Sequence, residues 1–109
     1  MVMLPRVALS AVPDYPPLMN VVHDSAAQRF TLAVSSGTAL LLYAPAGNGV
    51  LDIYSTFVPP DNRGQGVADR LVQAAVAHAR AEGLRIIPSC WYVSVWLQRH
   101  PEHADLIAA

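Results

Sequence analysis

The pattern of the chain changes at the pair Pro59 and Pro60, and this change constrains the fold most. Before it, residues 50–58 are rich in β-branched and aromatic side chains, which predicts a central strand. After it, a polar loop with two glycines spans 61–66. An Ala-rich stretch follows over 67–82. Its apolar residues recur three and four positions apart, which is the spacing of an amphipathic helix.

A second strand and a second helix come next. Gly83 stands where a left-handed residue ends a helix, and the apolar segment 84–87 predicts a short buried strand that ends at Pro88. Residues 90–100 predict another helix, which Pro101 ends. The two strands that flank the first helix therefore form a β-α-β unit, whose strands lie parallel with a right-handed crossover.

Three further strands are predicted upstream, at 20–24, 29–34 and 38–44. Residues 29–34 alternate polar and apolar side chains, as a half-buried strand does. Residues 1–18 hold four of the nine prolines, which predicts an extended N-terminal arm. Residues 19–109 are then expected to form a single domain.

The composition excludes several classes of protein. A chain of 109 residues is long enough for one core and too short for two. With 53% hydrophobic and 14% charged residues it is not a disordered chain, because disorder requires low hydrophobicity and high charge. The net charge is -1 and the seven basic residues, all arginines, are scattered, so we expect no nucleic-acid partner. A single cysteine excludes an internal disulfide and a Cys-rich metal site, and no metal is expected.

The same composition bears on location. No apolar run approaches the roughly 18 residues that a membrane-spanning helix needs. The apolar beginning of the chain is broken by Pro5 and has no charged region ahead of it, which argues against a signal peptide. We therefore expect a reduced, cytoplasmic protein without a membrane partner.

The loop between strand 50–58 and the first helix predicts an anion site. Gly64 and Gly66 lack Cβ, so the backbone can take positive φ there and a ligand can approach the main chain. The N–H groups of residues 64–69 would converge at the positive end of the helix dipole, and Arg63 would add a charged fork. A pyrophosphate fits these donors. The glycines also suit a tight turn without a ligand, because the third glycine of a dinucleotide fingerprint and the lysine of a P-loop are absent.

Three segments together carry a resemblance to a known family. The segment VPPDNRGQGVA at 58–68 resembles the acetyl-CoA-binding motif of the GNAT superfamily of N-acetyltransferases, which is a strand, an Arg-Gly-x-Gly-like loop and a helix. The segments IPSCWYV at 87–93 and RHPEHADL at 99–106 are similar to one small stand-alone branch of that superfamily. The resemblance covers residues 20–107.

The resemblance implies an α+β fold with a mixed antiparallel and parallel twisted sheet, a splayed central strand pair and two main helices. In this superfamily the pantetheine arm of acetyl-CoA adds to the strand edge in the gap between the splayed strands, here 50–58 and 84–87. The family's pantetheine contacts correspond to Phe57 and Val58. Its pyrophosphate contacts correspond to Arg63, Gly64, Gln65, Gly66, Val67 and Ala68.

Transfer of an acetyl group to an amine requires a deprotonated amine, a polarised thioester carbonyl and a proton for the leaving thiolate. The small branch has His-Thr-Glu where this chain has Ser55, Thr56 and Phe57, so the natural general base of the branch is missing. Many members of the superfamily protonate the thiolate with a tyrosine. The matching position here holds Trp96, and Tyr92 is the nearest phenol.

Cys90 is the remaining candidate for a catalytic residue. It stands at the predicted start of the last helix, where the helix dipole favours a thiolate, and near the gap between the splayed strands. A thiolate there can accept the acetyl group before passing it to the amine. The alternative is a lone cysteine that acts only as a small apolar side chain.

Other histidines and aromatic residues have structural interpretations. His23 ends a strand and is expected at the surface, whereas His78 lies on the apolar stripe of the first helix. Trp91 and Trp96 are about 140° apart on a helix. One of them is therefore expected to pack on the sheet and the other to line a groove or a partner surface.

Three functions remain open from the sequence. The first is a GNAT-like N-acetyltransferase that moves an acetyl group from acetyl-CoA to an unidentified amine. The second is an acyl-CoA-binding module without efficient turnover, because Phe57 replaces the expected glutamate. The third is a non-enzymatic interaction domain, in which the glycine loop is only a turn and Trp91 and Trp96 form a binding patch.

Overall fold

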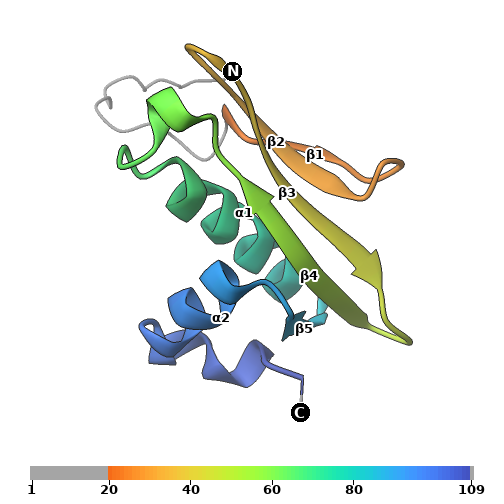
Figure 1. Ribbon diagram of the computed structural model, residues 1–109. Coiled ribbons are helices and arrows are strands. Elements are labelled where there is room, and N and C mark those ends of the chain that lie inside the picture. The colour runs from red at the N-terminus through yellow and green to blue at the C-terminus, as the bar shows by residue number, and fades with distance from the viewer. Residues whose placement is uncertain (1–19, 109) are drawn as a thin grey trace, which may run out of the picture.

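The computed structural model describes residues 20–108, so the arm predicted at 1–18 lies outside the described residues (Figure 1). The described chain forms two layers, a five-stranded sheet and two α-helices that cover one of its faces (Figure 1). The elements in chain order are β1 (Val22–Asp24), β2 (Arg29–Val34), β3 (Gly37–Pro45), β4 (Val50–Phe57), the 3-10 helix η3 (Pro60–Asn62), α1 (Val67–Glu82), β5 (Arg85–Pro88), α2 (Trp91–Gln98) and the 3-10 helix η4 (Pro101–Leu106).

The strands lie across the sheet in sequence order, β1-β2-β3-β4-β5. The first three neighbouring pairs are antiparallel. The last pair, β4 and β5, is parallel, because α1 carries the chain back along the sheet between them. The predicted α+β fold, with a mixed sheet and two main helices, is confirmed. No helix within residues 20–108 is long and apolar enough to cross a membrane.

Helix α1 has both of the bounds predicted for it, and a left-handed glycine flanks each end. Gly66 has φ 77° and Gly83 has φ 69°. A residue with a Cβ adopts this backbone only with strain, so glycine sets the two boundaries. Space does not explain the choice, because a Cβ built on either glycine would meet nothing within 4 Å in the described chain beyond its sequence neighbours.

The bounds of the last strand and the last helix differ from the prediction. β5 includes Pro88, which pairs with Ile53, and proline ends the ladder there because it has no N–H to donate. Helix α2 ends at Gln98 instead of residue 100. Pro101 then begins η4, which the sequence did not predict, since proline also suits the first position of a new helix.

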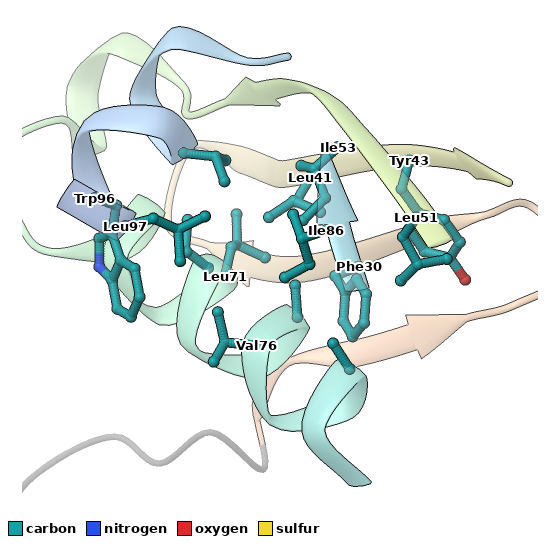
Figure 2. Packing of buried hydrophobic residues seen from close by; sticks show 14 of the residues in the cluster. Phe30, Leu41, Tyr43, Leu51, Ile53, Leu71, Val76, Ile86, Trp96 and Leu97 are labelled. Carbon is teal, nitrogen blue, oxygen red and sulfur yellow. The ribbon is translucent and has the colours of Figure 1, made fainter. Parts of the chain in front are cut away.

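The core lies between the helices and one face of the sheet. The buried strand residues alternate with exposed or half-buried ones and are Phe30, Leu32, Ala39, Leu41, Tyr43, Leu51, Ile53 and Ile86. The buried helix residues are Val67, Leu71, Val72, Ala75, Val76 and Ala79 in α1 and Val93, Trp96 and Leu97 in α2. Figure 2 shows the side chains of both helices interleaved with those of the strands. Each large apolar side chain buried here contributes about 1.5–3 kcal/mol, so this layer is the main source of stability.

Candidate functional site

The site begins where β4 and β5 part. Their parallel pairing ends at Ile53 and Pro88, and the next main-chain hydrogen bond runs from the N–H of Cys90 to the carbonyl of Ile53, at 2.9 Å. Beyond this point β4 continues to Phe57 and, within the described part of the chain, pairs only with β3. The edge of residues 54–57 on the β5 side is therefore open to another extended chain.

A β-bulge in β4 lies at the same point. Tyr43 of β3 pairs with Ile53 and Leu42 pairs with Ser55, so Tyr54 between them has no partner across the strands. A bulge bends its strand and increases the local twist. The bulge therefore falls where the pairing of β4 with β5 ends.

A pocket of about 450 Å³ lies at the open end of this gap. Its lining comes from the end of β4, the glycine loop, the first turn of α1 and one residue of α2, and consists of Thr56, Phe57, Val58, Asn62, Arg63, Gly64, Gly66, Val67, Ala68 and Tyr92. The structure thus brings together seven of the eight residues that the sequence assigned to cofactor binding. The exception is Gln65, whose Oε1 accepts a hydrogen bond from Asn62 at 3.1 Å.

The glycine loop presents its main chain to the pocket. Gly64 and Gly66 both have left-handed φ, 82° and 77°, which bends the loop back on itself. Between residues 20 and 108, no acceptor takes the main-chain N–H groups from Gly64 to Asp69, and no side chain caps the N-terminus of α1. These donors coincide with the positive end of the helix dipole, which is the arrangement that binds phosphate groups in proteins.

Arg63 adds a charge beside this loop. Its side chain is exposed, and its Nε donates to the carbonyl of Val58 at 3.0 Å. This bond ties the guanidinium to the end of β4, and the planar group still has its terminal nitrogens for an anion.

Cys90 lies beside the pocket and does not line it. It is the N-cap residue of α2 and is half-buried. Its Sγ lies 3.6 Å from Oγ1 of Thr56, which does line the pocket. The thiol therefore lies at the inner end of the gap between β4 and β5, next to the hydrogen bond from the N–H of Cys90 to the carbonyl of Ile53.

The two aromatic candidates of α2 differ in surroundings. Tyr92 lines the pocket, and its pKa is raised, first by burial and then by the carboxylate of Asp69, against an opposing effect of Arg99. Trp96 is 6% exposed and donates its indole N–H to Oδ1 of Asp69 at 2.5 Å, so this N–H is already used. Trp91 is 75% exposed. One tryptophan packs in the core and the other does not, as the helical spacing predicted.

The pocket has no group suited to act as a general base among its described lining residues, because none of them is acidic or a histidine. Thr56 pairs with the buried Leu41, so its side chain turns toward the helices. Ser55 and Phe57 alternate with it and turn toward the opposite face. Ser55 and Phe57 stand where the small branch of the GNAT superfamily has histidine and glutamate, and neither supplies a titratable group.

His23 is half-buried, so it lies only partly at the surface where the sequence placed it. Its ring stacks on Phe30 with 4.2 Å between ring centroids and meets His78 edge-on at 4.4 Å. Its Nε2 shares a hydrogen bond of 2.5 Å with the hydroxyl of Tyr43. Burial, followed by the nearby His78, lowers the pKa of His23. The cluster fastens the edge strand β1 to β2, β3 and α1.

The side-chain contacts of Thr56, Asn62 and Asp69 were not predicted. Thr56 contacts Cys90, Asn62 donates a hydrogen bond to Ser35, and Asp69 accepts one from Trp96. The two residues of each pair are 27 to 34 positions apart in the sequence. No local pattern records contacts of that separation. The sequence therefore carried no signal for them.

The fold and the site define a class of protein, a small α+β domain with a splayed strand pair and a helix N-terminus that face one pocket. Comparison with protein-family models assigns residues 29–106 to a family described as GCN5-related N-acetyl-transferase. The match spans more than half of the chain, and the chain belongs to this family.

Individual proteins agree with the assignment. The chain is 31% identical over 99 residues to protein NATD1 of Bos taurus, which covers 89% of this chain and 88% of that protein. It is 32% identical over 85 residues to protein NATD1 of Homo sapiens, covering 76% and 75% of the two chains. Among solved structures, it is similar to a Staphylococcus aureus protein described as GCN5-like and solved by NMR. The TM-score is 0.63 at 28% identity, over 75% of this chain and 82% of the other.

Proposed function

We propose that this chain binds acetyl-CoA in the pocket at the end of β4 and transfers the acetyl group to an amine. One observation carries the proposal, the meeting of the open strand edge at 54–57 with the N–H groups from Gly64 to Asp69. An open edge suits the amide-bearing pantetheine arm, and a bend of N–H groups at a helix N-terminus suits a diphosphate. Membership of the family supports the same coenzyme.

The residues would divide the coenzyme between them. Main-chain groups of Phe57 and Val58 would bond the pantetheine arm, and Arg63 with the N–H groups of the loop and first turn of α1 would bond the diphosphate. Gln65 would contribute through its main chain only, because its side chain is held by Asn62.

In the direct route of transfer, the nitrogen of the amine attacks the thioester carbonyl, the C–S bond breaks and the coenzyme leaves as a thiolate. Tyr92 would give that thiolate a proton, since it is the one phenol in the described pocket lining. The amine would lose its proton to water, because the described pocket lining offers no base.

In a two-step route, the thiolate of Cys90 attacks the thioester first. An S-acetyl-cysteine forms and the coenzyme thiolate leaves, and the amine then takes the acetyl group and regenerates the thiol. The hydroxyl of Thr56, 3.6 Å from Sγ, would orient the sulfur.

Coenzyme binding without efficient turnover is the second candidate. The lack of an acidic or imidazole group in the described lining favours it, because an ammonium substrate must lose a proton before it attacks. In this case the coenzyme would occupy the same pocket.

Calorimetric titration of the chain with acetyl-CoA, followed by assay of free CoA release with a panel of amines, tests the function. We expect saturable binding and a rise in melting temperature, because a ligand that binds only the folded state stabilises it. No heat of binding and no shift in melting at millimolar acetyl-CoA would overturn the proposal. Binding without CoA release for any amine would support the second candidate instead.

The role of Cys90 requires its own measurement. After incubation with acetyl-CoA, intact-protein mass spectrometry should detect an acetyl adduct on the wild type and on Ser89→Ala, a neighbouring control. It should detect none on Cys90→Ala, whose CoA release should be slower. An unchanged rate in Cys90→Ala would remove the thiol from the mechanism and leave the direct route.

A further inference from the structure

Asn62 is buried in a segment that is otherwise exposed. It closes η3, immediately before the glycine loop, and is 5% exposed, while its neighbours Asp61 and Arg63 are exposed. It is the one polar residue that the structure buries between residues 20 and 108. Burial of an amide is unfavourable unless its hydrogen-bonding groups are satisfied, so the contacts of this side chain decide its role.

All of the hydrogen-bonding capacity of the Asn62 amide is used. Its Oδ1 accepts the main-chain N–H of Ser36 at 3.3 Å and also the hydroxyl of Ser36. Its Nδ2 donates to Oγ of Ser35 at 3.1 Å and to Oε1 of Gln65 at 3.1 Å. One side chain thus joins the turn between β2 and β3 to the middle of the glycine loop. Figure 1 shows this turn and the loop after β4 at the same end of the molecule.

The bond to Gln65 matters because of its position between Gly64 and Gly66. Glycine loses more conformational freedom on ordering than any other residue, so a loop with two glycines has many conformations open to it. The Asn62 amide holds the side chain of this residue, Gln65, which is exposed and does not line the pocket. Gly64 and Gly66 on either side of it offer the pocket their main chain. A loop held in its binding conformation binds more tightly, because less ordering remains to be done when the ligand arrives.

We propose that Asn62 is a positioning residue for the diphosphate of the coenzyme. It holds the glycine loop against the Ser35 and Ser36 turn, in the conformation in which the N–H groups of the loop converge. This inference rests on the proposed coenzyme binding. It makes the affinity for the coenzyme depend on a turn that contributes no residue to the pocket lining.

The experiment compares two ligands on three chains. Affinities for CoA and for pantetheine, which lacks the diphosphate, are measured by NMR titration on the wild type, on Asn62→Ala and on Gln65→Ala. Gln65→Ala removes only the loop end of the network and keeps the proposal testable if Asn62→Ala does not fold. Gln73→Ala is the matched control, because Gln73 also makes one side-chain hydrogen bond, to Asp69 at 2.6 Å, on α1 outside the loop.

We expect both loop variants to bind CoA about threefold to tenfold more weakly, the effect of losing one net hydrogen bond or slightly more. Their affinity for pantetheine should stay within twofold of the wild type, and Gln73→Ala should bind both ligands as the wild type does. Equal weakening for both ligands, or unchanged affinity for CoA in folded Gln65→Ala, would overturn the positioning role. Failure of the proposed function is distinguishable, because the wild type itself would then bind no CoA, and the positioning role would fail with it.

Discussion

Replacing Gly66 with alanine separates the geometry of the glycine loop from its effect on folding. Gly66 has φ 77°, and a Cβ there meets no atom of the described chain within 4 Å beyond its sequence neighbours. The variant is therefore strained by its backbone and not by a clash. Gly83 at the other end of α1 has φ 69° and equally open surroundings, which makes Gly83→Ala a control with the same local strain outside the pocket.

The two effects have different sizes. A residue with Cβ in the left-handed region costs about 1–2 kcal/mol, and the lower entropy of the unfolded alanine chain offsets about 0.4–1 kcal/mol of it. We expect a net loss of about 1 kcal/mol for either variant, which lowers the melting temperature of a domain of this size by about 4–8 °C. In Gly66→Ala the backbone would relieve this strain by moving away from left-handed φ. The N–H groups that follow residue 66 would then no longer converge on the proposed diphosphate site. The loss of even one bond to a charged phosphate is worth about 1.5–3 kcal/mol, so affinity should fall at least about tenfold.

The assay is calorimetric titration of acetyl-CoA at a temperature at which both variants are folded, with melting followed by circular dichroism. Gly66→Ala should melt lower and bind at least about tenfold more weakly. Gly83→Ala should melt lower to a similar extent and bind as the wild type does. Wild-type affinity in folded Gly66→Ala would refute the assignment of the diphosphate to this loop. An equal loss of affinity in both variants would mean that general destabilisation, and not loop geometry, controls binding.

Two further predictions concern the helices and the edge strand. Trp96→Phe removes the indole hydrogen bond to Asp69 and should lower the free energy of unfolding in urea titrations by about 1.5–3 kcal/mol, the typical contribution of a hydrogen bond to a charged group. The control Trp91→Phe changes an exposed side chain and should lower it by less than about 0.5 kcal/mol. Equal losses in the two variants would contradict a structural role for the indole N–H of Trp96. Burial and the neighbouring His78 lower the pKa of His23 in the folded chain below its ordinary value of about 6.5. The unfolded chain therefore binds a proton at His23 more readily than the folded chain does. The stability that neutral His23 contributes is complete above about pH 6.5 and is lost as the pH falls. Melting temperatures from pH 7.5 to 5 should therefore fall more steeply for the wild type than for His23→Gln, and parallel curves would contradict the assignment.

Most elements of the fold could be predicted from the sequence, because their signals are local. The 3.6-residue spacing in α1 and its closing Gly83 define the helix without reference to the rest of the chain. The same holds for the alternation in β2. The bulge at Tyr54 was not predicted, because it is a mismatch between two strands and neither strand alone records it.

The candidate site could be predicted in part. The glycine loop was predicted because positive φ selects for a residue type, so the backbone requirement is visible as Gly64 and Gly66. The burial of Asn62 was not predicted, because an asparagine after Pro60 and Asp61 is also an ordinary turn residue exposed to water. The partial burial of His23 was not predicted for a related reason, since the residues that pack on its ring, Phe30 and His78, come from other elements.

By itself the sequence determined which elements form, where proline and glycine end them, and that a bend of main-chain donors precedes α1. These properties depend on φ restrictions and side-chain periodicity, which act within a few residues. Only the tertiary structure decided where β4 leaves β5, that the thiol of Cys90 meets Thr56, and that Asn62 ties a distant turn to the loop. Such contacts depend on the register and packing of segments far apart in the chain, and that information is distributed over the whole core.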